Sequence, residues 1–455
     1  MTDAALPLAR PRTFFGQPPA LAYLAFTEAW ERFSYYGMTA LLTLYMTKQL
    51  FLSGHVENVA GFAVLRAGLE SVFGPMTPLA LASQIFGLYT AFVWFTPILG
   101  GLVADRWIGR RNAVAMGAVL MSGGHLAMAF DVSFLPALVL LVVGCGLLKG
   151  NISVQVGQLY PATDDAGRTR GFAIFSMGIN VGATAGPVVC GFLALAYGWH
   201  AGFGLAGILM LCGLATYLAG YRALADAAPK PAAVSAPGVA PPAVAAPGET
   251  RRLLALGAVA AISIFQSIAY YQIANIGLVW IDRAVDPRLW GVSIPPSAFS
   301  SLDSLSSIVF VPVLFGLWRW QAGRGGEPDD LGKIATGAWI SVAGNLVLAA
   351  AAGLGGRVSP LWPLAAFTLQ GIAFLYYWPT LLALVSRVAP SRLKSTLMGA
   401  VFLSLFISNS IIGRLGGFYE AMTPTMFWLM HAAIATAGAV LAVTLRSPLK
   451  RALES

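Results

Sequence analysis

One segment near the N-terminus places ionisable side chains inside an otherwise apolar stretch. The run LAYLAFTEAWERFSYYGMTALLTLYMT contains Glu28, Glu31 and Arg32. In a helix these charges share one face with Tyr35 and Tyr36, because their spacing follows i, i+3, i+4, i+7 and i+8. A carboxylate beside an arginine can take up a proton and so release the guanidinium to bind another anion. The pattern predicts proton-linked anion binding; the alternative is an ion pair that only holds helices together.

A second interior cation is Lys149, in the run LVVGCGLLKGNISVQVGQLY. It lies about nine residues, or roughly 13 Å, from the inner end of its predicted span. Arg32 lies about twelve residues into its own span, so we expect the two cations at similar depth. Together they would bind a carboxylate of the protein or of a solute. The alternative is that Lys149 extends along apolar surface to the inner face of the membrane.

The composition of the whole chain explains why such charges need a special environment. Of its 455 residues, 57% are hydrophobic and only 10% are charged, and the mean hydropathy is +0.73. Soluble domains carry about 25% charged residues. The composition therefore excludes a cytosolic enzyme, a nucleic-acid-binding protein and a disordered scaffold, and it indicates an all-α membrane protein.

Apolar runs long enough to cross a bilayer, roughly 20 residues each, occur twelve times. They cover residues 20–47, 79–104, 112–130, 134–156, 170–196, 201–221, 252–280, 297–318, 334–354, 360–387, 396–419 and 425–445. An Ala/Pro-rich linker, residues 222–251, separates six spans from six. We therefore expect an N-terminal six-helix bundle (1–221) and a C-terminal one (252–455). Residues 48–78 are predicted to form an external loop with one short surface helix.

The distribution of basic residues predicts the topology. Of the 28 Lys and Arg residues, most fall on the side of the N-terminus, and few fall in the opposite loops. The opposite loops hold Lys48, Arg66, Arg283, Arg288 and Arg357. Because cytoplasmic loops carry the excess of basic residues, both termini are predicted to be cytoplasmic in a bacterial inner membrane. The net charge of +9 then reflects topology and not affinity for nucleic acid.

Several motifs resemble those of the proton-dependent oligopeptide transporter family, within the major facilitator superfamily. TEAWERFSYYG resembles its ExxER motif, LLKGNISVQVGQLY its fourth span, and GFAIFSMGINVGATAGP its fifth. YYQIANIGLVWIDRAVD and YYWPTLLALVSRVAPSRLKSTLMG resemble spans 7 and 10 more weakly. The resemblance implies a major facilitator fold and proton coupling through Glu28, Glu31 and Arg32. It also implies a peptide carboxylate held by Arg32 and Lys149 in a cavity lined by Tyr35, Tyr36 and Asn180. Tyr271, Gln272 and Trp378 in the second half are further candidate binding residues; the alternative for some of these side chains is an aromatic belt at the membrane interface.

The sequence departs from the family pattern at the end of the site that would meet a peptide amino group. Phe374 stands where the family has a span-10 Glu, and Tyr271 stands where it has a span-7 Glu. The usual Tyr of span 2 is Trp94, and the Arg that would face span 7 is Thr39. The pocket is therefore expected to be aromatic and less polar at this end.

Asp303, in SAFSSLDSLSS, falls where the family tends to have Asn. It is a candidate replacement for the lost acid, as partner of Lys149 or of a substrate cation. The alternative is that it caps the start of a helix, a common role for Ser and Asp in such a segment.

The segment PILGGLVADRWIGRR resembles the superfamily's loop between spans 2 and 3. Asp105, Arg106 and Arg110 are expected to form a cytoplasmic clasp that controls alternating access, with the Asp pairing across the bundle. The alternative is a solvated turn.

We therefore expect a proton-coupled symporter of di- or tripeptides or peptide-like solutes that works by alternating access. Its partners would be the solute, protons and the lipid bilayer, with the protein as a monomer. The sequence has no phosphate-binding loop, zinc spacing or nucleophile elbow, so neither a cofactor, a metal nor an enzymatic reaction is expected. Two alternatives stay open: a symporter of a non-peptide anionic or amino-blocked solute, and a non-transporting membrane receptor with the same cavity.

Overall fold

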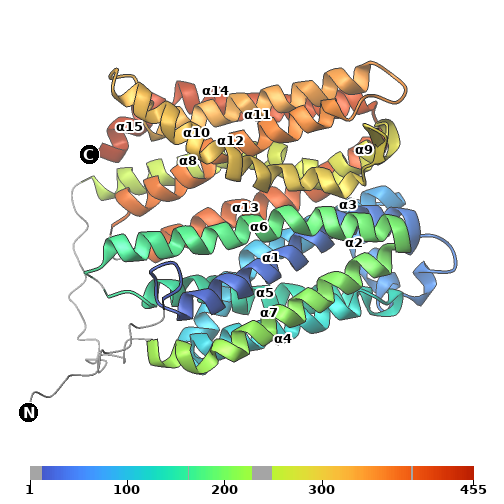
Figure 1. Ribbon diagram of the computed structural model, residues 1–455. Helices are drawn as coiled ribbons and strands as arrows, with labels where there is room; N and C mark the ends of the chain where they lie inside the picture. The colour runs from blue at the N-terminus through green and yellow to red at the C-terminus, as the bar shows by residue number, and fades with distance from the viewer. Residues whose placement is uncertain (1–12, 162, 228–247, 391–392, 455) are drawn as a thin grey trace, which may run out of the picture.

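The computed structural model describes residues 13–161, 163–227, 248–390 and 393–454, and almost all of them are helical. The long helices before the linker are α1 (Ala20–Tyr45), α3 (Pro78–Val103), α4 (Arg110–Ala127), α5 (Phe134–Gln158), α6 (Asp165–Tyr197) and α7 (Trp199–Ala227). Those after it are α8 (Glu249–Gln272), α10 (Ser301–Ala322), α11 (Asp330–Gly353), α12 (Leu361–Val388), α13 (Lys394–Gly416) and α14 (Pro424–Thr444). They lie side by side along one direction (Figure 1). The predicted all-α architecture is confirmed.

Short elements lie mainly at the ends of the long helices. They are the helices α2 (Phe62–Phe73), α9 (Leu278–Ala284) and α15 (Arg446–Glu454), and the strands β1 (Arg288–Leu289) and β2 (Val292–Ser293) of one antiparallel hairpin. Wide π-helical turns follow α1 (Met46–Leu50), α3 (Ala104–Ile108) and α8 (Ile273–Gly277), the last two having local consequences described below. Single 3₁₀ turns occur at Val56–Asn58, Asp131–Ser133, Pro296–Ser300 and Gly417–Glu420.

Ten helices in the described part of the chain are long and apolar enough to cross a membrane. The two remaining long helices, α1 and α4, are less apolar. Helix α1 contains Glu28, Glu31 and Arg32, and α4 begins with Arg110 and Arg111. Both nevertheless pack among the spanning helices, α1 against α6 and α7, and α4 against α5 and α7. The count of twelve spans stays a prediction for these two.

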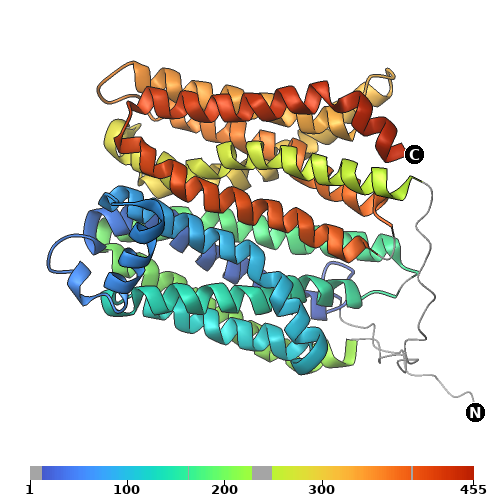
Figure 2. The same cartoon turned by 180° about the vertical axis from the view of Figure 1, so that it is seen from behind.

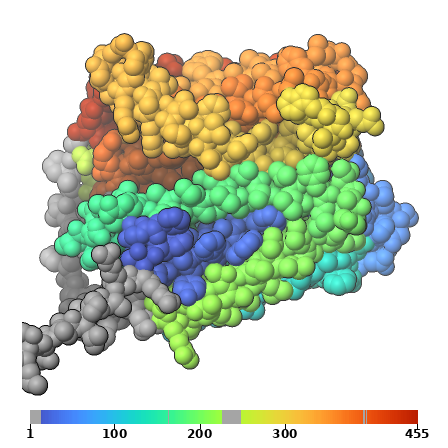
Figure 3. All heavy atoms as spheres, viewed as in Figure 1, coloured from blue at the N-terminus to red at the C-terminus, as the bar shows by residue number. Residues whose placement is uncertain are grey.

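The helices pack mainly within two groups. In the first, α3 contacts α5 in addition to the pairs named above; in the second, α11 lies between α12 and α14, and α8 contacts α13 and α14. The groups meet where α3 packs against α13 and α6 against α10. Figure 3 shows α6 and α10 side by side on one face, and Figure 2 shows the molecule from behind.

The predicted linker is shorter in the structure than in the sequence analysis. Helix α7 continues to Ala227 and α8 already begins at Glu249, while residues 228–247 of the linker lie outside the described residues. The predicted loop at 48–78 contains α2 and a single turn of 3₁₀ helix. The first described residues and α15 lie at one end of the bundle, and α2 and α9 lie at the other (Figure 1). We call these the α15 end and the α2 end.

Candidate functional site

The charged face of α1 is buried inside the first group of helices. Glu28 and Arg32 are 3% exposed and Glu31 is fully buried. The Arg32 Nε atom lies 3.2 Å from Glu28 Oε1 and also donates a hydrogen bond to Glu31 Oε2. One oxygen of each carboxylate has no hydrogen-bond partner among the described residues, and neither has Arg32 Nη2. Both acids of the cluster thus share one nitrogen of Arg32, and unpartnered oxygens of both acids remain beside an unpartnered nitrogen of the guanidinium.

Glycines on the neighbouring helix α6 bring α1 close enough to bury this cluster. A Cβ atom at Gly182 would lie 2.2 Å from the carbonyl oxygen of Ala29, so only glycine allows this approach. On the α7 side, the Ser34 hydroxyl donates to the carbonyl of Ala206 at 2.7 Å. The opposite face of α1 is thus fixed by packing, which points the charged face toward the interior.

Lys149 lies over an aromatic ring instead of beside an acid. Its Nζ atom is 3.5 Å from the ring centroid of Trp94, a cation–π contact. Trp94 in turn contacts Tyr271 and Trp378, with ring centroids 6.4 and 6.2 Å apart. Because these rings belong to the second group of helices, Lys149 points toward the boundary between the groups. This direction agrees with the predicted cavity and not with extension to the inner surface.

Aromatic rings surround this boundary. Trp94 stacks on Phe402 at 6.0 Å, and Phe374 stacks on Trp378 at 6.3 Å and on Tyr270 at 5.0 Å. Phe374, which stands where the family pattern has an acid, is therefore part of an aromatic wall. The sequence analysis did not single out Phe402; only the docking of α13 against α3 reveals its place.

Asp303 is half-buried in the first turn of α10 and has no cationic partner among the described residues. Its Oδ1 atom is buried without a hydrogen-bond partner. Its electrostatic neighbours are the tyrosines Tyr270 and Tyr36. Ser300, at the N-cap position of α10, makes no side-chain capping hydrogen bond. The start of this helix therefore does not show the capping that was the alternative for this segment. Asp303 also forms no ion pair with Lys149, the first of its two predicted partners.

The remaining predicted residues take different positions. Tyr35 lies 5.3 Å from the Arg32 guanidinium and contacts Tyr36 edge to face. Asn180 is half-buried on α6. Gln272 is fully buried, and neither of its amide atoms has a partner among the described residues.

The predicted clasp forms locally. Arg110 Nη2 lies 2.9 Å from Asp105 Oδ1, across the turn made by Gly109 at φ +76°, and both side chains are partly exposed. Among the described residues Asp105 forms no ion pair with the second group of helices; its partner Arg110 begins α4, the next long helix of the same group. Arg106 is exposed.

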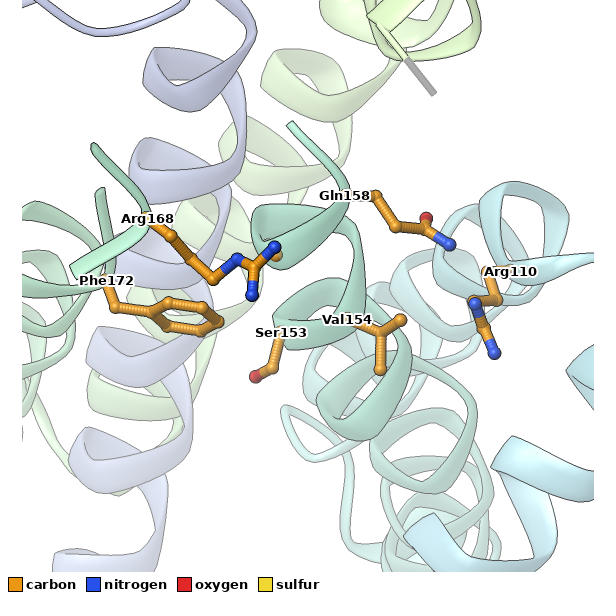
Figure 4. A pocket seen from close by; sticks show the side chains of 7 residues that line it. Arg110, Ser153, Val154, Gln158, Arg168 and Phe172 are labelled. Carbon is orange, nitrogen blue, oxygen red and sulfur yellow. The ribbon is translucent and has the colours of Figure 1, made fainter. Parts of the chain in front are cut away.

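An open hollow of about 560 Å³ lies beside this clasp. Arg110 and Arg168 lie on either side of Ser153, Val154 and Gln158 of α5 (Figure 4). Arg168 already contacts Asp165, at 3.7 Å. The hollow is separate from the boundary where Lys149 and Asp303 lie.

The two groups of helices are closed against each other at the α2 end. There Lys48 Nζ lies 2.7 Å from Asp282 Oδ1, and Thr77 donates to Glu420 at 2.6 Å, both across the boundary. At the α15 end, the ion pairs recorded for the described residues stay within one group, as in Arg446–Asp329 at 2.9 Å. The structure therefore has the α2 end closed.

Comparisons with known proteins agree with this arrangement. A family model described as the POT family matches residues 111–240 and 242–431. A peptide transporter of Yersinia enterocolitica is 31% identical over 98% of this chain and 97% of its own length. A di-/tripeptide transporter of Lactococcus lactis is 28% identical over 96% and 97%. A crystal structure of a POT peptide transporter variant in complex with alafosfalin is similar with a TM-score of 0.84 and 28% identity, covering 98% of this chain and 97% of that one.

Proposed function

Because the chain belongs to the POT family of transporters, we propose that it is a proton-coupled symporter of di- and tripeptides or peptide-like solutes. The observation that supports coupling most directly is the buried cluster of Glu28, Glu31 and Arg32, in which each carboxylate keeps one oxygen without a partner. When a buried acid beside an arginine takes up a proton, it loses its negative charge, and the arginine becomes free to pair with another anion. The cluster supports coupling better than a purely structural ion pair, which needs only one acid.

The proposed binding step uses the two cations. When a proton neutralises Glu28 or Glu31, Arg32 is free to bind a solute carboxylate together with Lys149. Lys149 is suited to this because its present partner, the Trp94 ring, is a weaker and less directional contact than a carboxylate. Alternating access then exposes the solute first at the α2 end and afterwards at the α15 end.

We place the α15 end in the cytoplasm of a bacterium, with both termini inside, on the basis of the basic residues of the sequence. The chain is proposed to work as a monomer within two six-helix bundles, 1–221 and 252–455. Substrate and protons leave inward.

The aromatic wall favours a second candidate within transport. Phe374 and Trp378 stack where a peptide amino group would need an acid, so an amino-blocked or purely anionic solute also fits. In this case Asp303 would not bind the substrate. A receptor that binds solute without moving protons is the third candidate.

Proton flux into proteoliposomes separates these candidates. Free di- and tripeptides, acetylated peptides and simple carboxylates are added, and the pH of the lumen is recorded. We expect peptide-driven acidification that Glu31→Gln abolishes and that Glu57→Gln, a change in an exposed loop acid, leaves unchanged. Acidification with blocked peptides or anions alone would replace the peptide proposal by the second candidate. Solute binding without any proton movement would favour the third candidate, a membrane receptor that does not transport.

A further inference from the structure

A chain of three hydrogen bonds crosses the boundary between the helix groups near the α2 end. Thr43 of α1 donates to Asn275 Oδ1 at 3.0 Å, and Asn275 Nδ2 donates to Ser83 Oγ of α3 at 2.7 Å. Ser83 then donates to the carbonyl oxygen of Gly413, in α13, at 2.9 Å. Thr43 and Ser83 belong to the first group of helices, and Asn275 and Gly413 belong to the second. Each of the three hydrogen bonds therefore crosses the boundary. Asn275 thus connects the groups through both ends of its amide.

All three side chains of this relay are shielded from water. Asn275 and Ser83 are fully buried and Thr43 is 2% exposed. Two other contacts across this end, Lys48–Asp282 and Thr77–Glu420, involve partly exposed side chains, whereas Ser297 donates a buried hydrogen bond to the carbonyl of Pro187 in α6 at 3.2 Å. Exposed ion pairs contribute little because water and salt screen them, whereas a buried polar group that loses its partner is costly. The relay is therefore a buried polar contact that is lost when this end opens, and Asn275 contributes two of its hydrogen bonds.

Glycines keep the backbones close at the same level. A Cβ atom at Gly416 would lie 2.0 Å from Ser83 Oγ, and one at Gly87 would lie 2.6 Å from the backbone of α13. Asn275 itself lies in the π-helical turn Ile273–Gly277. Such turns are rare and occur often at functional sites. The relay therefore lies where the backbones of the two groups approach closely enough to require glycine.

We propose that Asn275 is a gating residue that holds the α2 end closed through its two hydrogen bonds, to Thr43 and Ser83. The inference rests on the proposed alternating access, since opening this end must separate α1 and α3 from α13 and the turn that carries Asn275. The relay consists of uncharged groups, so it can close this end whichever protonation state the acids of α1 have. In this role Asn275 acts by positioning α1 and α3 against the second group of helices.

The test measures the opening of the α2 end directly and without solute. Cysteines replacing Val64 in α2 and Leu354 after α11, both exposed, carry spin labels in a Cys212→Ser background. Their distance distribution is recorded in lipid nanodiscs. We expect Asn275→Leu to raise the ratio of open to closed molecules about tenfold, because two buried hydrogen bonds are lost only from the closed state. Thr43→Val should produce a smaller shift in the same direction.

Thr90→Val is the matched control. Thr90 is also buried, but its hydroxyl bonds only to carbonyls of its own helix, Phe86 and Gly87. Unchanged distances in both Asn275→Leu and Thr43→Val, or equal shifts in all three variants, would overturn the proposal. Should Asn275→Leu fail to fold, Thr43→Val and Ser83→Ala decide the question. Because no solute is needed, the result stands even if the chain moves neither peptides nor protons.

Discussion

At the scale of residues, the charges of the interior are unevenly matched. Two acids share Arg32, Lys149 rests on an aromatic ring, and Asp303 lies near tyrosines with no cationic partner among the described residues. The first arrangement could be predicted because its members lie on one helix at fixed spacing. The other two depend on how the helix groups dock, so the sequence indicated the residues but not their partners. Asp303 is half-buried and without a cation in the part of the chain that the structure describes, which leaves it available to a cationic group of a solute.

This reasoning leads to a prediction for Asp303→Asn. If Asp303 receives the amino group of a peptide, the variant should bind free-amino dipeptides at least about tenfold more weakly, since a charge-assisted hydrogen bond contributes about 1.5–3 kcal/mol. Acetylated dipeptides should bind unchanged. Competition against a labelled substrate in proteoliposomes measures both affinities. Equal losses for the two kinds of peptide would assign Asp303 a structural role.

At the scale of elements, the hydropathy pattern predicted the positions of the long helices well. It could not predict the π-helical turns or the exact ends of α7 and α8, because these depend on neighbouring helices. Nor did the sequence analysis foresee how α15 is attached: the Asp329 carboxylate accepts from the backbone N–H of Gly332 in α11 at 2.8 Å and lies 2.9 Å from Arg446 Nη2 of α15. One side chain thus caps one helix and holds another.

The attachment of α15 should depend on pH. Burial raises the pKa of Asp329, but the amide of Gly332 and the guanidinium of Arg446 outweigh it and hold the pKa below its usual value. A carboxylate with a lowered folded-state pKa stabilises the fold above its ordinary pKa of about 3.9 and loses this effect as the pH falls through the lowered value. Asp329→Asn keeps a capping side chain but loses the partly exposed ion pair with Arg446, so it should lower stability by about 0.2–1 kcal/mol at pH 7.

The measurement is thermal unfolding of the detergent-solubilised protein between pH 7 and pH 3. The melting temperatures of wild type and Asp329→Asn should converge toward the acid end. Asp165→Asn, a change in the first turn of α6 where the side chain is 88% exposed, serves as control and should have little effect. A constant difference at every pH would mean that the charge of Asp329 contributes nothing.

At the scale of the whole molecule, the sequence predicted the architecture because lipid leaves few alternatives to packed helices. It could not predict that the α2 end is closed, since closure depends on how the two groups of helices dock and not on the composition of either end. The closed state is visible only in contacts between residues far apart in the chain, such as Lys48 with Asp282. The side of the membrane on which this end lies stays a prediction from the distribution of basic residues.

That orientation can be tested with single cysteines at the two ends. Val64 lies in α2 and Ala322 at the end of α10, and both are exposed. In a Cys212→Ser background, a membrane-impermeant maleimide added to intact spheroplasts should label Val64→Cys and not Ala322→Cys. Lysis should make both reactive, while the buried Cys145 and Cys190 stay protected. Because basic residues favour the cytoplasmic side, labelling of Ala322→Cys alone in intact cells would invert the proposed topology, and with it the direction in which solute and protons leave.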